Sequence, residues 1–121
     1  MRENNNIKKI VVLDNNYYYN LILTKQIQHF TNSLNIKNET EFIVNSYLNT
    51  SAFFSEIQPD TDLVILDFYL EEGKSTLSIL RRIKKQCRKT KIIVISKFRN
   101  LNTYVKTLLN DANKFIYKEK N

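Results

Sequence analysis

Residues 63–66 read LVIL, a run of four apolar residues that ends directly before Asp67. Two similar runs are IVVL at residues 10–13 and IIVI at residues 92–95. Short continuous apolar runs rich in β-branched residues are typical of strands that are buried on both faces of a parallel sheet. Residues 42–44 and 115–117 are weaker strand candidates, so the sequence predicts five strands.

Between these runs, apolar residues recur at spacings of three and four, which is typical of amphipathic helices. Such stripes cover residues 19–34, 77–87 and 101–109, and Phe30 belongs to the first of them. A shorter helix fits residues 52–57, with capping residues at 49–51. The mostly polar segment 33–41 is expected to be a surface loop. Strict alternation of strands and helices predicts an open, parallel α/β sheet with helices on both faces.

The composition excludes several classes of protein. A chain of 121 residues fits one domain, and its net charge of +7 raises the question of an acidic partner. One glycine excludes the Gly-rich dinucleotide fingerprint and the P-loop, and one cysteine with one histidine excludes a disulfide framework and a zinc cage. No leader or apolar run long enough for a membrane span is present in the sequence, so we expect a soluble cytoplasmic protein.

Polar side chains stand at the ends of four predicted strands. Asp14 and Asn15 follow the first strand, Asp67 the third, Ser96 the fourth and Lys118 the fifth. In open parallel sheets, ligands bind beyond the carboxyl ends of the strands. The oxygens of both aspartates and of Asn15 suit Mg²⁺, and a carboxylate nucleophile would form an acyl phosphate. The lysine could neutralise that phosphate and the serine could donate a hydrogen bond to it.

In their order and spacing, four segments resemble the response-regulator receiver domain (CheY-like) of bacterial two-component signalling: VVLDN at 11–15, LVILDFYLEEGKS at 63–75, IIVIS at 92–96 and DANKFIYK at 111–118. The resemblance covers nearly the whole chain. It implies a flavodoxin-like, five-stranded sheet of order 2-1-3-4-5 in a single domain over residues 1–121. It also implies that Asp67 accepts a phosphoryl group from a histidine kinase or phosphotransfer protein.

The resemblance further implies how each site residue contributes. The implied ligands of Mg²⁺ are Asp14, Asp67 and the backbone carbonyl of Tyr69, with help from Asn15. Ser96 would hydrogen-bond to the phosphoryl group and Lys118 would pair with it, while Phe115 would change rotamer as the switch. Phosphorylation would then alter the surface of the fourth helix and fifth strand to control an output partner, so the chain is expected to be a switch and not an enzyme.

The sequence departs from the family's pattern at five places. Two of them are Glu71, where a proline is common after the acceptor, and a longer stretch between Asp14 and Asp67, with the excess in residues 33–41. The other three affect the metal site, the lysine loop and the end of the fold. Asn15 replaces a usual acid, Glu119 replaces the proline that normally follows the lysine, and only three residues follow Lys118, so the family's last helix is missing or truncated. Two hypotheses follow from that missing helix. The chain is the N-terminal part of a longer regulator, or it pairs with a second copy through the sheet face left uncovered.

Two rival functions stay open on the sequence. The first is a degenerate receiver that is never phosphorylated and serves as a constitutive interaction or dimerisation module. The second, ranked low, is a hydrolase of the haloacid-dehalogenase type, which would need an acid where Tyr69 stands.

Residues 81–91, RRIKKQCRKTK, carry seven basic side chains in eleven positions. They can be a solvated helix end or an electrostatic contact for an acidic partner or DNA, and we favour the solvated end. Nucleic acid is expected to bind only through a separate output domain. Cys87 completes the apolar stripe of its helix and is expected to be buried.

Overall fold

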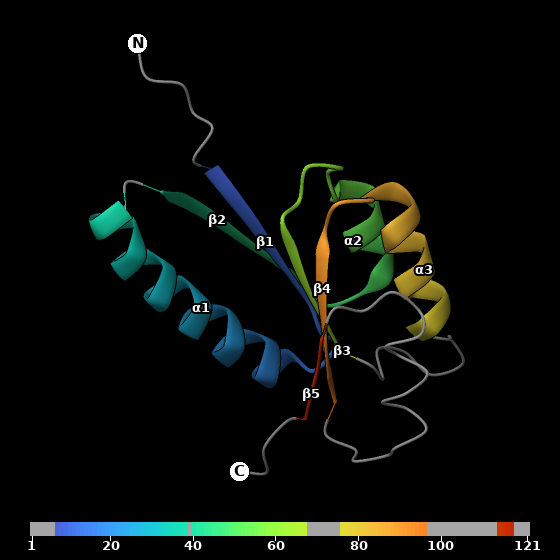
Figure 1. Ribbon diagram of the computed structural model, residues 1–121. Coiled ribbons are helices and arrows are strands. Elements are labelled where there is room, and N and C mark those ends of the chain that lie inside the picture. Colours follow the sequence, from blue (N-terminus) through green and yellow to red (C-terminus); the bar gives the residue numbers. More distant parts are fainter. Residues whose placement is uncertain (1–6, 39, 68–75, 97–113, 118–121) are drawn as a thin grey trace.

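The computed structural model describes residues 7–38, 40–67, 76–96 and 114–117. They form a parallel five-stranded sheet in the order β2-β1-β3-β4-β5, which confirms the predicted topology (Figure 1). The strands are β1 (Ile7–Leu13), β2 (Glu41–Tyr47), β3 (Leu63–Asp67), β4 (Lys91–Ser96) and β5 (Lys114–Tyr117). The helices are α1 (Tyr17–Asn38), α2 (Thr50–Glu56) and α3 (Thr76–Gln86).

The helices cover both faces of the sheet. Helix α1 packs on one face against β1 and β2, and α2 and α3 lie on the other (Figure 1). The main core lies on the second face because alternate strand residues point there and meet the apolar sides of α2 and α3. Its members are Val11, Leu13, Phe53, Val64, Leu66, Ile79, Leu80, Ile83, Ile92 and Val94.

Helix α2 begins two residues earlier than predicted and is capped by one of the three predicted capping residues. Asn49 is its N-cap, in extended conformation, and its side-chain oxygen accepts a hydrogen bond from the backbone N–H of Ala52 at 2.8 Å. Such a cap satisfies one of the amides that a helix start leaves without an intrahelical partner. The buried thiol of Cys87, just after α3, is also confirmed.

The expectation for residues 33–41 was wrong over most of its length, because α1 continues to Asn38. The side of α1 that meets the sheet is also shifted by one position from the predicted stripe. Its buried residues are Asn20, Thr24 and Thr31, whereas Phe30 is 62% exposed. The other residues of the predicted stripe, Tyr19, Leu23, Ile27 and Leu34, are half-buried beside these polar residues, so apolar periodicity placed the face of α1 about one position off.

The face of the sheet that we expected to be exposed is mostly covered. On the α1 side, Val12 is fully buried, and Ile65 and Ile95 are only 9% and 5% exposed. Ile116 in β5 is 40% exposed. Among the described residues, this face of β1 and β4 therefore shows no broad exposed apolar patch, and the exposed apolar residue there is Ile116 at the β5 edge.

Several predictions lie outside the described residues, namely the helix over 101–109, Tyr69, Lys118, and whatever follows β5. Within the part of the chain that the structure describes, no helix has the length and apolar character needed to cross a bilayer.

Candidate functional site

Two buried carboxylates lie side by side at the carboxyl edge of the sheet. Leu13 of β1 is paired with Leu66 of β3, so the next residue on each strand is an aspartate, Asp14 and Asp67. Neighbouring strands lie about 4.8 Å apart. Asp14 is 0% exposed and Asp67 is 5% exposed. Burying two carboxylates together is unfavourable unless charge or hydrogen bonds offset it, which is a reason to regard this edge as a site.

The turn after β1 holds the Asp14 carboxylate in place. Its Oδ1 accepts a hydrogen bond from the backbone N–H of Asn16 at 2.9 Å. Asn16 in turn is the residue before α1, and its side-chain oxygen accepts a hydrogen bond from the N–H of Tyr19 at 2.8 Å. The carboxylate and the helix start are therefore fixed by one turn, a local pattern typical of Asp and Asn before a helix.

A buried asparagine that the sequence did not point to supports the same turn. Asn20 of α1 is 4% exposed, and its side-chain amide donates to the main-chain oxygen of Asp14 at 2.9 Å and of Tyr47 at 3.0 Å. The hydroxyl of Thr24, one helical turn further, donates to the Asn20 Oδ1 at 3.2 Å. This amide ties the ends of β1 and β2 to α1. A single asparagine inside a helix has no pattern that would have revealed this role.

Tyr47 connects the site edge to α2. Its hydroxyl hydrogen-bonds to Glu56 at 3.0 Å, and its ring packs edge-on against Phe53 with ring centres 5.9 Å apart. Burial raises the pKa of Tyr47, and the neighbouring Glu56 carboxylate raises it further. The main-chain oxygen of Tyr47 also accepts a hydrogen bond from the N–H of Asp14 at 3.2 Å. Tyr47 therefore links the ends of β1 and β2.

The other predicted site residues are placed only in part. Asn15 follows Asp14 at the same edge and is exposed. Ser96 is the last residue of β4 and is paired with Tyr117, the last residue of β5. Phe115 lies in β5, paired with Val94. Tyr69 and Lys118 lie outside the described residues, as do the side-chain surroundings of Ser96 and Phe115.

The donors at this edge fit a small, hard cation. Two carboxylates and an exposed amide oxygen are the oxygen ligands that Mg²⁺ takes, with waters completing its octahedron. Among the described residues, no group of three or more His, Cys, Asp or Glu could hold a metal, so a site here needs Asn15, main-chain oxygens or water beside Asp14 and Asp67. With those additional oxygen ligands, Asp14 and Asp67 fit a Mg²⁺ site.

No family model and no curated protein matches the sequence. Solved structures match it closely in three dimensions. A response regulator from Burkholderia pseudomallei, solved with a phosphorylated aspartic acid, a calcium ion and citrate, gives a TM-score of 0.74 at 16% identity, over 94% of this chain and 61% of that one. The chain has the receiver-domain fold.

Two further structures agree on this fold. The response regulator DrrB from Thermotoga maritima gives a TM-score of 0.74 at 20% identity, over 95% of this chain and 47% of DrrB. The beryllofluoride-activated NtrC4 receiver domain dimer gives 0.75 at 16% identity, over 93% of this chain and 85% of that one. The chain thus spans less than two thirds of the Burkholderia protein and of DrrB.

Proposed function

We propose that this protein is a phosphoacceptor switch in which Asp67 takes a phosphoryl group from a histidine kinase or phosphotransfer protein. The observation that carries the proposal is the pair of buried aspartates in register, Asp14 and Asp67, at the carboxyl edge of a receiver-domain sheet. A similar structure with a phosphorylated aspartic acid and a divalent cation supports the chemistry. The proposal also places the protein in the cytoplasm, where a kinase finds ATP.

In the proposed reaction, a carboxylate oxygen of Asp67 attacks the phosphorus of phosphohistidine. The new O–P bond forms as the P–N bond breaks, and its electron pair stays on the imidazole nitrogen, which takes up a proton. Bound Mg²⁺ would offset the negative charge that gathers between the carboxylates and the phosphoryl oxygens. Asp14, Asp67, Asn15 and the carbonyl of Tyr69 are the residues that would hold it.

Two further residues would read the phosphoryl group. Ser96 ends β4 beside Tyr117, the last residue of β5, and Lys118 is the next residue in the sequence. We propose that Ser96 hydrogen-bonds to the phosphoryl oxygens and that Lys118 pairs with them. A switch works only if the phosphoryl group interacts more favourably with one of two conformations. Phe115 would change rotamer with that transition, so β5 and the helix expected before it would carry the signal to an output partner.

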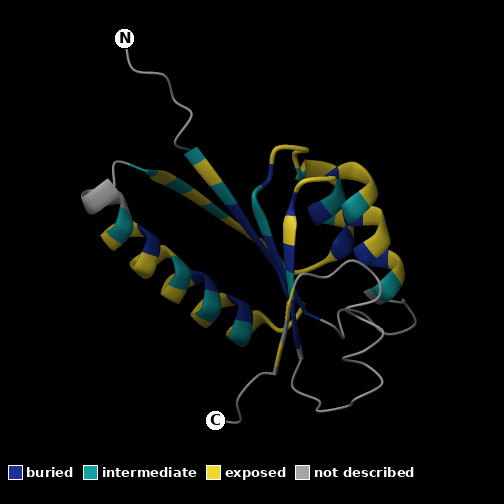
Figure 2. Ribbon diagram, viewed as in Figure 1, coloured by how far each residue is buried: buried dark blue, intermediate teal, exposed yellow. Residues whose placement is uncertain are grey.

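Helix α1 offers a surface for the phosphodonor protein. Exposed positions run along the outer side of α1 (Figure 2). The exposed large apolar residues of α1 are Tyr17, Tyr18, Leu21 and Ile22, soon after the Asp14 turn, and Phe30, two turns further along. Exposed apolar groups clustered on one helix mark interaction sites. We propose that the donor docks there, so that changing Tyr18 and Phe30 to serine would slow transfer from the cognate phosphodonor protein but leave labelling by phosphoramidate unchanged. If the variant accepted phosphate from the phosphodonor protein as fast as wild type did, and from phosphoramidate as fast as well, this docking site would be contradicted.

Labelling with phosphoramidate in the presence of Mg²⁺ tests the function itself. We expect the wild-type chain to gain a phosphoryl group, detected as a band of altered mobility, and EDTA to prevent it. Asp67→Asn should abolish labelling. Asp60→Asn is the matched control because Asp60 is 67% exposed and pairs with Lys9 away from the site. Persistent labelling of the Asp67 variant would refute the assignment.

A degenerate receiver is the second candidate, and Asn15 favours it. An amide in place of an acid removes one negative ligand, which lowers the affinity for a divalent cation. A titration decides between the candidates, since a switch requires Mg²⁺ binding at millimolar concentration or below. No binding and no labelling would establish a constitutive interaction module instead.

A further inference from the structure

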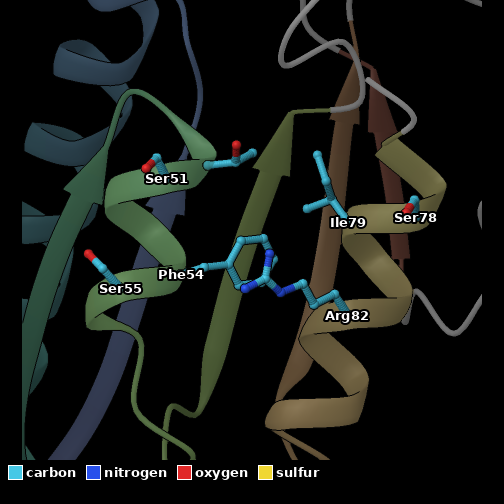
Figure 3. Close-up of a pocket in the computed structure, with 7 residues that line it drawn as sticks. Ser51, Phe54, Ser55, Ser78, Ile79 and Arg82 are labelled. Atoms are coloured by element: carbon cyan, nitrogen blue, oxygen red, sulfur yellow. The ribbon is translucent and has the colours of Figure 1, made fainter. Parts of the chain in front are cut away.

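A recess opens between α2 and α3, on the face of the molecule opposite α1 (Figure 3). Its volume is about 570 Å³, which is within the range of sites that hold small groups or a few side chains. The residues that line it are Thr50, Ser51, Phe54, Ser55, Ser78, Ile79 and Arg82. We call this hollow the α2–α3 recess.

Arg82 reaches into the recess in a fixed orientation. Its guanidinium carbon lies 3.9 Å from the centre of the Phe54 ring, and Figure 3 shows the side chain extending from α3 to that ring. Phe54 is itself held edge-on by Phe53, which is fully buried, with ring centres 4.9 Å apart. Stacking satisfies one face of the guanidinium, whereas its N–H groups point outward in the guanidinium plane. Within the described chain, those N–H groups have no hydrogen-bond or ion-pair partner.

The surroundings of Arg82 are basic and hydroxylated. Among the residues that the structure describes, no acidic side chain lines the recess, and Ser51 belongs to its lining on α2. A second hollow, of about 610 Å³, continues along α3 and is lined by Arg81, Arg82, Lys84 and Lys85. Lys84 has a structural hydrogen bond, because its ammonium donates to the main-chain oxygen of Thr90 at 2.9 Å. Between residues 73 and 110 the sequence has no Asp or Glu, so the stretch around α3 carries a net positive charge.

We propose that the α2–α3 recess binds an acidic segment of a partner protein, with a glutamate or aspartate carboxylate on the guanidinium of Arg82. A planar guanidinium with free edge donors pairs bidentately with a carboxylate. The apolar walls at Phe54 and Ile79 suit the methylene groups of a glutamate. A recess between two helices has room for a few side chains, whereas the backbone of a nucleic acid duplex requires an open surface. The site is distinct from Asp67 and does not depend on its phosphorylation.

Fluorescence anisotropy with a fluorescein-labelled hexaglutamate peptide tests the proposal on the full chain. Arg82→Gln should weaken binding about tenfold, the loss of one charge-assisted bidentate contact. Phe54→Leu should also weaken binding, because the guanidinium loses the ring that holds it. The matched control is Arg88→Gln, which removes the same charge from an exposed residue of a separate hollow that also contains Asp60 and Asp62. It should change affinity by less than about twofold.

Three outcomes would overturn the proposal. Equal losses in the Arg82 and Arg88 variants would mean that only net charge attracts the peptide. Displacement of the peptide by inorganic phosphate at the same concentration would mean that the recess holds a free anion. Tighter, Arg82-dependent binding of a duplex DNA oligonucleotide would assign the surface to nucleic acid. Circular dichroism of each variant, unchanged from wild type, ensures that the loss is not one of folding.

Discussion

The side-chain amide of Asn20 lies 2.9 Å from the main-chain oxygen of Asp14, one of the two carboxylates at the proposed phosphorylation site. The bond joins a helix to the turn after β1, and the same amide also bonds to the end of β2 through Tyr47. Because Asn20 and its bond to Asp14 are buried, the two hydrogen bonds act as a fixed link between the outer strand and the site. We infer that the geometry of Asp14 depends on Asn20.

Replacing Asn20 by alanine should weaken both stability and metal binding. Two main-chain oxygens would lose a buried donor, which costs about 1–3 kcal/mol of unfolding free energy. Loss of the same link should lower Mg²⁺ affinity, measured by calorimetric titration at a temperature where the variant is fully folded. Thr24→Val is the control, because it removes the Thr24 hydroxyl that donates to the Asn20 Oδ1 but leaves the hydrogen bond from Asn20 to Asp14. If both variants bound Mg²⁺ as tightly as wild type, Asn20 would be a structural residue only.

Two phenylalanines should differ sharply in their effect on stability. Phe53 is fully buried in the main core, so Phe53→Ala should lower the unfolding free energy by about 3–5 kcal/mol. Phe30 is 62% exposed on α1, so Phe30→Ala should change it by less than about 0.5 kcal/mol. Urea denaturation measures both. A large loss from Phe30→Ala would show that α1 packs on the sheet through the stripe expected from the sequence.

Tyr47 should make stability depend on pH at the alkaline end. Its folded-state pKa is raised above the ordinary value of 10.0, first by burial and then by Glu56. The unfolded chain therefore loses the proton first, and the stability due to neutral Tyr47 is present below pH 10 and lost as pH rises through the folded-state pKa. The unfolding free energy of wild type minus that of Tyr47→Phe should thus fall above pH 10. A difference that is constant with pH would contradict the raised pKa.

The sequence predicted the sheet well because β1, β3 and β4 are buried on both faces, so their apolar runs are continuous. The strand order, which the resemblance to receiver domains implied, was confirmed, and one of the three predicted capping residues, Asn49, caps α2 because capping is a local signal. Helix α1 was harder. Its contact with the sheet is made by polar residues such as Asn20 and Thr31, and periodicity of apolar residues cannot detect a polar face.

At the candidate site too, sequence reasoning placed some residues and not others. Asp14 and Asp67 were found because strand ends in a parallel sheet meet at one edge, a rule that needs only the strand positions. Asn20 was missed because its role depends on the distance from α1 to two main-chain oxygens, which no spacing in the sequence encodes. Arg82 was grouped with a run of basic residues, and only the position of Phe54 on another helix distinguishes it from them.

The central claim is that Asp67 carries the phosphoryl group, and the most direct measurement identifies the modified residue. The chain is incubated with phosphoramidate and Mg²⁺, reduced with sodium borohydride, digested and sequenced by mass spectrometry. Borohydride converts an aspartyl phosphate to homoserine. We predict homoserine at position 67 and aspartate at position 14, whereas homoserine at any other position, or an unmodified Asp67 in every peptide, would contradict the account.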